Sequence, residues 1–188
     1  ANSVVIGVAP SGGALKAESV SVLAEAIKSG LSLVSGLHRK LSEESELVTA
    51  AAASGQQLID IRVPPSSIAI ATGRQRSGKR LLMVGTDCCV GKKYSALSLH
   101  KALQERGIAA TFRATGQTGI LIAGGGIPMD AVVSDFLSGA AETLTPDAAS
   151  DHWDVIEGQG SLFHPAYAAV TLGLLHGSQP DAMVLCHG

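Results

Sequence analysis

The stretch GTDCCVGKKYS at residues 85–95 constrains the fold of this chain more than any other part of its sequence. It has most of the features of a phosphate-binding loop, in which glycines precede a lysine and a residue with a hydroxyl group. Gly85, Gly91 and Lys92 fit, whereas Lys93 stands where Ser or Thr is usual. The apolar segment RLLMVGT precedes the loop, and a segment with a helical pattern follows it. The sequence therefore predicts a strand, an anion-binding loop and a helix over residues 81–106.

In such a loop, successive backbone N–H groups and the helix N-terminus surround an anion, and the lysine adds a positive charge. Lys93 cannot coordinate Mg²⁺ as the usual hydroxyl does, and Ser95 comes two positions late. This favours a cofactor that is held by its phosphates without hydrolysis, such as coenzyme A, over ATP with Mg²⁺. An ordinary turn with a solvated lysine is the alternative. The predicted cofactor-binding residues are Gly85, Thr86, Asp87, Val90, Gly91, Lys92, Lys93, Tyr94 and Ser95.

A second motif, HWDVIEGQGSLFHP, places Glu157 at the end of a short apolar strand. Ligands of open α/β sheets bind at the carboxyl ends of the strands, and a carboxylate beside a phosphate loop suits Mg²⁺. We predict that Glu157 is a metal ligand or a catalytic group. His164, in the loop that follows, is the predicted general base that takes a proton from an attacking amine. A structural carboxylate and a non-catalytic loop histidine are the alternatives.

The segment RATGQTG at 113–119 follows another predicted strand and supplies the predicted substrate site. The planar fork of Arg113 matches a carboxylate, while Thr115, Gln117 and Thr118 offer hydroxyl and amide groups. An ordinary strand-to-helix loop with one surface arginine is the alternative. His187, at the end of the last predicted strand, is a further residue that could face the site.

The order of apolar and amphipathic segments predicts two α/β parts. Residues 1–61 alternate strands and helices as a Rossmann-like part, although their first turn, APSGG, lacks the GxGxxG pattern, so we assign no NAD to it. Residues 62–79 are rich in Pro, Ser and Gly and are predicted to form a linker. Residues 80–188 form the predicted phosphate-loop domain. Apolar strands at both ends suggest that the chain is truncated at the N-terminus and at the C-terminus.

Composition narrows the range of partners. Of the 188 residues only 3% are aromatic, and the net charge is −2 without a basic tract, so we expect no nucleic acid. No apolar run reaches membrane-spanning length, so we expect no membrane partner. The three cysteines make neither a disulfide framework nor a zinc spacing, which favours the reducing cytoplasm.

Two resemblances add to this interpretation. The pair GTDxxVGK and VIEGxG resembles dethiobiotin synthetase, which implies an ATP- and Mg²⁺-dependent ligase or kinase that acts on a small carboxylic acid. A longer set of segments covers nearly the whole chain and includes VIGVAPSGG, GTDCCVGKKYSAL, ATGQTGI and DHWDVIEGQGSLFHPAYAAV. This set is similar to a prokaryotic family labelled a domain of unknown function, sometimes called epimerase/dehydratase-like.

That family pairs a Rossmann-like N-terminal domain with a phosphate-loop C-terminal domain, and it includes D-glutamate N-acetyltransferases. The resemblance implies an N-acetyltransferase that moves an acyl group from acetyl-CoA to a small amino acid such as D-glutamate. We therefore expect an α/β protein, a Rossmann-like parallel sheet followed by a P-loop NTPase-like parallel domain, that acts as a cytoplasmic homo-oligomer. A non-catalytic nucleotide-binding module is a third hypothesis.

Overall fold

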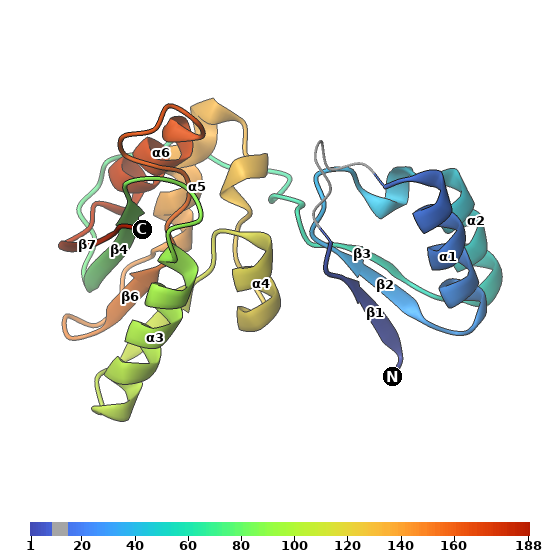
Figure 1. Cartoon of the computed structure of the whole chain (residues 1–188). Coiled ribbons are helices and arrows are strands. Elements are labelled where there is room, and N and C mark those ends of the chain that lie inside the picture. Colours follow the sequence, from blue (N-terminus) through green and yellow to red (C-terminus); the bar gives the residue numbers. More distant parts are fainter. Residues whose placement is uncertain (9–14) are drawn as a thin grey trace. The chain divides into compact units, whose positions relative to one another are not determined.

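The computed structural model of the chain describes residues 1–8 and 15–188, which form two compact units, Ala1–Val63 and Pro64–Gly188. Both units are α/β, and all strand pairs in them are parallel (Figure 1). The predicted fold class is therefore confirmed. The APSGG turn, at residues 9–13, lies outside the described residues. Among the described residues, no helix has both the length and the apolar composition that crossing a membrane requires.

The N-terminal unit has a three-stranded sheet in the order β1-β2-β3. Its strands are β1 (Ser3–Ile6), β2 (Ser32–Ser35) and β3 (Leu58–Asp60), and its helices are α1 (Ala17–Lys28), the 3₁₀ turn η2 (Leu41–Glu43) and α2 (Ser45–Ser54). One face of the sheet packs against α1 and α2, because their apolar positions recur at helical spacing and form a shared core with the strands. The members of this core that are buried completely are Ile27, Leu33, Leu41 and Leu47.

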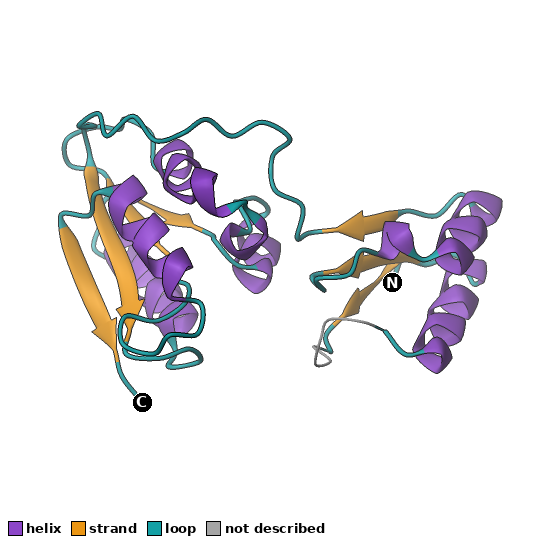
Figure 2. Ribbon diagram, turned by 90° about the horizontal axis from the view of Figure 1, so that it is seen from above, coloured by secondary structure: helices purple, strands orange, loops and turns teal. Residues whose placement is uncertain are grey.

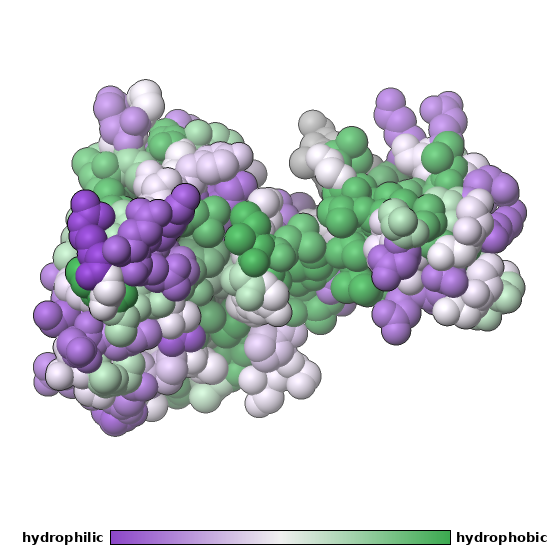
Figure 3. Space-filling view, turned by 90° about the horizontal axis from the view of Figure 1, so that it is seen from below, coloured by the Kyte–Doolittle hydropathy of each residue, from purple (hydrophilic) through white to green (hydrophobic). Residues whose placement is uncertain are grey.

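The other face of this sheet is open within the unit. Val5, Val34 and Ile59 are aligned across the three strands, and the side chains of Val5 and Ile59 are 56% and 40% exposed. Figure 3 shows apolar residues concentrated on the sheet side of this unit, whereas its helix side is mostly hydrophilic. Among the described residues of the N-terminal unit, helices therefore cover one side of the sheet.

The C-terminal unit has a four-stranded parallel sheet in the order β5-β6-β4-β7. The strands are β4 (Lys79–Gly85), β5 (Ala110–Arg113), β6 (Trp153–Ile156) and β7 (Ala182–Cys186). The helices are α3 (Lys92–Glu105), α4 (Gln117–Ala123), α5 (Leu137–Leu144) and α6 (Ala168–Ser178). Alternate residues of β4 point to opposite faces, so that Leu82 packs with α5 and α6 and Met83 packs with α3. Helices thus cover both faces of the sheet, as Figure 2 shows, and this explains the continuous apolar runs of its strands.

The segment predicted as a linker packs on the C-terminal unit from Pro64 onward. Thr72 donates its hydroxyl hydrogen to Glu142, Arg74 pairs with Asp147, and the buried Arg76 reaches carbonyl groups of α5 and α6. A Cβ atom on Gly139 would collide with the carbonyl oxygen of Ala69, so α5 needs glycine where this segment crosses it. Residues 64–78 are therefore a covering layer of the second unit, and only the boundary beside Pro64 separates the two units.

Two segments of the C-terminal unit have short or interrupted helices. Two 3₁₀ turns, η3 (Met129–Ala131) and η4 (Ser134–Phe136), precede α5. Val132 and Val133 between them are extended, as β-branched residues prefer. The glycine-rich segment after Gly116 contains the short helix α4, which ends at Gly124 in the left-handed conformation.

Candidate phosphate-binding site

The loop between β4 and α3 forms the predicted strand–loop–helix turn. Gly91 is the N-cap of α3, with φ of 94°, and no side chain in the described part of the chain caps this helix end. The N–H groups of the first turn therefore point to the loop without a side-chain acceptor, as an anion site requires. Five residues separate Gly85 from Gly91, where the usual pattern has four, and Cys89 adopts a positive φ of 61° within this longer loop.

Lys92 folds back over the loop. Its side chain is only 7% exposed, and Nζ donates a hydrogen bond to the carbonyl oxygen of Asp87 at 2.8 Å. Two glycines make room for it. A Cβ atom on Gly85 would lie 2.9 Å from this Nζ, and one on Gly158 would lie 3.1 Å from Cδ of the same lysine and collide with the Met83 carbonyl. A weakly hydrated ammonium group beside the loop N–H groups is suited to bind a phosphate oxygen.

The last strand brings His187 to the loop. Nδ1 of His187 lies 3.0 Å from Oγ1 of Thr86, and the Thr86 N–H group donates to the Cys186 carbonyl at 3.0 Å. The sequence alone placed His187 only at a strand end. Its proximity to the loop follows from the strand order, because β7 pairs with β4 and ends beside Gly85.

Glu157 is buried, at 2% exposure, just beyond the carboxyl end of β6. Its Oε2 atom accepts hydrogen bonds from the N–H groups of Thr115 at 2.9 Å and Gly116 at 3.0 Å. Burial raises the pKa of Glu157, while these two N–H groups and the charge of Lys93 act in the opposite direction. The carboxylate therefore holds the turn between β5 and α4 in place, which is a role that the sequence did not reveal.

No group of three or more His, Cys, Asp or Glu side chains in the described part of the chain could hold a metal ion. Mg²⁺ that arrives with a phosphate ligand needs only one or two carboxylates, so this finding leaves the metal role of Glu157 a prediction.

Arg113, the last residue of β5, already has a carboxylate partner within the chain. Its Nε donates to Oδ1 of the buried Asp154 at 2.7 Å, and Nε2 of His152 lies 3.5 Å from the same oxygen. A clamp on a substrate carboxylate would therefore have to use the Nη groups of Arg113. Asp154 lies on the neighbouring strand opposite Thr111, a pairing that spacing along the chain cannot show.

The other predicted substrate residues fall into different environments. Thr115 is completely buried, and its hydroxyl donates to the Glu157 carbonyl at 2.7 Å and accepts from Gln159 at 3.2 Å. Gln117 is half-buried and Thr118 exposed in the first turn of α4. Thr115 thus belongs to the buried network around Glu157, and only Gln117 and Thr118 have surface to offer a ligand.

His164 lies in the segment 160–167, which crosses the phosphate loop. The Leu162 N–H group in this segment donates to the Gly85 carbonyl at 2.9 Å. His164 is exposed, and its Nδ1 accepts the N–H group of Ala166 at 3.1 Å. A neutral ring with Nδ1 as acceptor carries its proton on Nε2, so the nitrogen that would take a proton is engaged in this structure. The general-base role of His164 stays a prediction.

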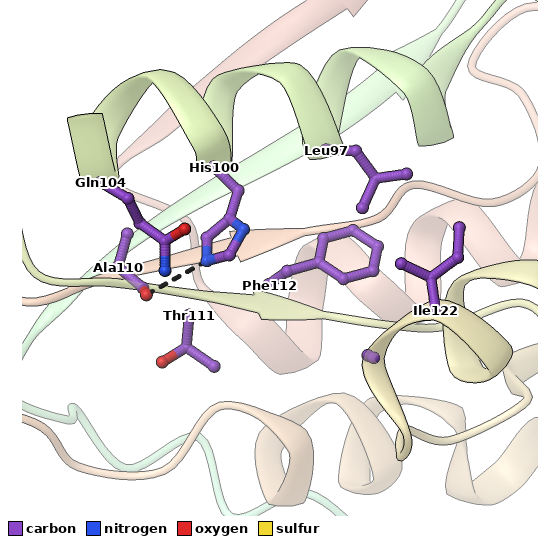
Figure 4. A pocket seen from close by; sticks show the side chains of 8 residues that line it. Leu97, His100, Gln104, Ala110, Thr111, Phe112 and Ile122 are labelled. Atoms are coloured by element: carbon purple, nitrogen blue, oxygen red, sulfur yellow. Dashed lines mark hydrogen bonds between the residues drawn. The ribbon is translucent and has the colours of Figure 1, made fainter.

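A separate pocket of about 360 Å³ lies between α3, β5 and α4 (Figure 4). Nε2 of His100 is 3.3 Å from the Ala110 carbonyl, and its ring packs tilted against Phe112 with centroids 6.3 Å apart. These contacts are typical of a structural histidine. The pocket is next to the start of β5 and has no charged lining residue, so it is unsuited to a phosphorylated cofactor; its lining comprises Leu97, His100, Gln104, Ala110, Thr111, Phe112, Ile122 and Ala123.

The pairing of Glu157 with two backbone N–H groups leads to a prediction. Glu157→Gln keeps an acceptor oxygen and removes a buried charge, so we expect its free energy of unfolding to stay within about 1 kcal/mol of the wild type at neutral pH, whereas Glu157→Ala should lose about 2–4 kcal/mol because two donors lose their acceptor. Urea unfolding by circular dichroism measures both. If activity requires a metal that Glu157 binds, Glu157→Gln should also lose the metal-dependent activity.

The same pair of variants has a defined pH dependence. The pKa of Glu157 is higher in the folded state than in the unfolded state, so ionisation of Glu157 lowers the free energy of unfolding of the wild type. The wild type regains this stability as the pH falls below the folded-state pKa. Any advantage of Glu157→Gln over the wild type should therefore shrink on acidification. A constant difference from pH 8 down to pH 4, below the ordinary pKa of a glutamate, or global unfolding of the Gln variant, would contradict this account of Glu157.

Comparison with known proteins decides the family. Residues 1–64 match a Rossmann-like domain described as a domain of unknown function, DUF1611_N, and residues 68–188 match the DUF1611_C P-loop domain. The chain belongs to the DUF1611 family. The predicted family and its order of domains are thereby confirmed.

Members of the family extend beyond this chain. A "D-glutamate N-acetyltransferase" of Pseudoalteromonas sp and one of Tritonibacter scottomollicae are each 56% identical to it over 187 residues, and the chain spans 56% of the length of each. A crystal structure of a DUF1611 protein from Anabaena variabilis ATCC 29413 is 40% identical with a TM-score of 0.91; the alignment covers 99% of this chain and 55% of that one. This likeness supports the parallel sheets described above.

Proposed function

We propose that the protein to which this chain belongs transfers an acetyl group from acetyl-CoA to the amine of a small amino acid, with D-glutamate as the acceptor. Two relatives that are 56% identical over the whole chain and bear the name D-glutamate N-acetyltransferase support this acceptor. The observation that carries the cofactor is the buried Lys92, whose ammonium group folds back over the loop at the start of α3 and is followed by Lys93.

These residues fit a phosphorylated cofactor that is not hydrolysed. The loop N–H groups with Lys92 and Lys93 would bind phosphate oxygens, and Lys93 occupies the position of the usual Mg²⁺ ligand. Acetyl-CoA would supply the acyl group as a thioester. The residues of this chain would have two further tasks: Arg113 would orient the acceptor carboxylate through its Nη groups, and Glu157 or His164 would take the amine proton.

Glu157 and His164 suit the proton transfer for different reasons. The pKa of Glu157 is raised, which brings it closer to neutral pH, as a general base requires. Its Oε2 atom, however, already accepts two backbone N–H groups. His164 is exposed on the segment that contacts the loop. His187 is a third group within reach of the loop, through its contact with Thr86.

One observation favours a second function, an ATP- and Mg²⁺-dependent ligase or kinase that acts on a small acid. Glu157 follows β6, which pairs directly with the loop-bearing β4, and a carboxylate in this position suits Mg²⁺. Lys93 opposes this function, because it cannot supply a metal ligand. A nucleotide-binding module without turnover is the remaining alternative.

A single assay on the full-length protein separates these functions. We expect consumption of acetyl-CoA in the presence of D-glutamate and no release of ADP from Mg·ATP under the same conditions. L-Glutamate serves as the control for the chirality of the acceptor. Release of ADP without consumption of acetyl-CoA would establish the second function instead, and nucleotide binding without either reaction would establish the third.

A further inference from the structure

Three exposed aromatic residues belong to the segments that follow or contact the phosphate loop. The chain has only three Phe, two Tyr and one Trp, so exposed rings are scarce. Tyr94, Phe163 and Tyr167 are nevertheless 69%, 74% and 70% exposed. An isolated exposed ring needs no explanation, but three of so few beside one anion site indicate a binding surface.

Each of these residues lies in, or directly follows a residue that contacts, the loop or the start of α3. Tyr94 lies in the first turn of α3, and Nζ of Lys93 is 4.7 Å from the centroid of its ring. Phe163 directly follows Leu162, whose N–H group donates to the Gly85 carbonyl at 2.9 Å. Tyr167 directly follows Ala166, whose carbonyl oxygen is 4.0 Å from Sγ of Cys88. The segment 160–167 therefore contacts the loop at Gly85 and at Cys88, and it carries two of the three exposed aromatic residues.

This segment is held from the side of α6. Thr171 donates its hydroxyl hydrogen to the Gln159 carbonyl at 2.6 Å, and the Ser161 hydroxyl donates to the His164 carbonyl. Gly160 has a φ of 70°, and a Cβ atom there would collide with the Tyr167 carbonyl. Tyr167 itself has a φ of 61°, a conformation that residues other than glycine seldom adopt and that functional sites often retain.

We propose that Tyr94, Phe163 and Tyr167 form a base-binding platform on which the adenine ring of the phosphorylated cofactor stacks while the loop binds its phosphates. This inference shares one premise with the proposed function, namely that the cofactor carries an adenine ring. It does not depend on acetyl transfer. An apolar protein partner fits less well, because it would have to bury Lys93 beside Tyr94 and the uncapped start of α3. A base stacked on the rings would leave Lys93 and the N–H groups at the start of α3 free to bind the phosphates of the same cofactor.

Calorimetry on the full-length protein tests the platform with two probes, ADP and inorganic pyrophosphate, of which only ADP carries a base. Phe163→Ala and Tyr94→Ala should each weaken ADP binding by about 5- to 100-fold, the range expected for loss of one stacked base. Pyrophosphate affinity should change by less than about twofold, because no phosphate contact is removed. Phe163→Trp should retain ADP affinity, because it keeps a stacking ring.

Met183→Ala is the matched control. Met183 is an exposed apolar residue of the same unit, 55% exposed on β7, opposite Leu82 and three positions before the strand ends. Its substitution should change the affinity for neither probe. A reduced ADP affinity in this variant would mean that loss of any exposed apolar side chain weakens binding, and the platform would be abandoned.

Three other results would overturn the proposal. Equal losses for ADP and pyrophosphate would show that the rings only support the loop. Unchanged ADP affinity in both alanine variants, with or without a loss of thermal stability, would show that the rings do not contact the base. If the wild type binds ADP no more tightly than pyrophosphate, or binds neither of them, the protein does not recognise the base. ADP binding that depends on the rings in a protein that does not consume acetyl-CoA would retain the platform and refute only the proposed function.

Discussion

Replacement of Arg76 by leucine is expected to lower the free energy of unfolding of the C-terminal unit by about 3–5 kcal/mol, the loss typical of a broken buried charge network. Arg76 is only 5% exposed. Its Nη1 donates to the carbonyls of Glu142 and Thr145 at 2.7 and 2.8 Å, and its Nη2 donates to those of Gly177 and Ser178 at 2.6 and 3.2 Å. One guanidinium group thus caps the carboxyl ends of both α5 and α6.

The physical reason for the large effect is that four backbone carbonyls lose a donor together, although the Glu142 carbonyl keeps the Thr145 N–H group. Each orphaned polar group costs about 1–3 kcal/mol when water cannot reach it, and the positive charge also stabilises two helix C-termini. Burial and the neighbouring Arg80 lower the pKa of Arg76, but a guanidinium group stays protonated in proteins. Lysine has no planar fork and cannot contact both helices, so Arg76→Lys should recover only part of the loss.

Arg74→Leu is the matched control for this prediction. Arg74 is two residues away in the same covering segment, but it forms an exposed pair with Asp147, in which the two side chains are 64% and 46% exposed. This pair holds the pKa of Asp147 at about 2, yet solvent screens the attraction. Guanidinium chloride unfolding should show almost no change of midpoint for Arg74→Leu. Equal midpoints for the two leucine variants would refute the capping role of Arg76.

The sequence predicts well what depends on local pattern. The strand, loop and helix around Gly85–Ser95, the parallel strands and the position of Glu157 at a strand end follow from apolar runs and glycines, and the structure has them. The role of Arg76 was missed for a physical reason: its partners are 66 to 102 residues away in sequence, and a Pro- and Ser-rich surrounding is typical of linkers.

Contacts across the sheet explain the remaining differences at the site. Arg113 pairs with Asp154, 41 residues away, and the Thr115 hydroxyl donates to the Glu157 carbonyl across 42 residues. Strand order decides both contacts, and the sequence does not give strand order. The same reason applies to His187, which lies beside Thr86 only because β7 pairs with β4. In the segment 160–167 the sequence pattern indicates only His164, because the contacts of this segment with Gly85 and Cys88 are not visible in the sequence.

A loss of affinity for every phosphate-bearing ligand is expected at Lys92. Lys92→Met keeps the apolar stem that packs beside Gly158 and removes only the charge, so the fold should be retained. The affinity for CoA, ADP and pyrophosphate should fall at least tenfold, because a charge-assisted hydrogen bond contributes about 1.5–3 kcal/mol. Calorimetry measures this loss, and circular dichroism checks the fold. Unchanged affinity for all three ligands in a folded variant would refute phosphate binding by this loop.

Lys93→Thr is the companion variant, because it restores the hydroxyl group of an ordinary phosphate loop. Lys93 lies over the Tyr94 ring and is less buried than Lys92, so its replacement should weaken CoA binding by less than the change at Lys92 does. In the proposed acetyltransferase this variant should release no ADP from Mg·ATP, since a threonine alone does not complete an NTPase site. In an ATP-dependent ligase the same change supplies the usual metal ligand and should preserve or raise Mg²⁺-dependent ADP release. Comparison of ADP release with acetyl-CoA consumption in the wild type and in Lys93→Thr therefore distinguishes the two enzymes through a single side chain.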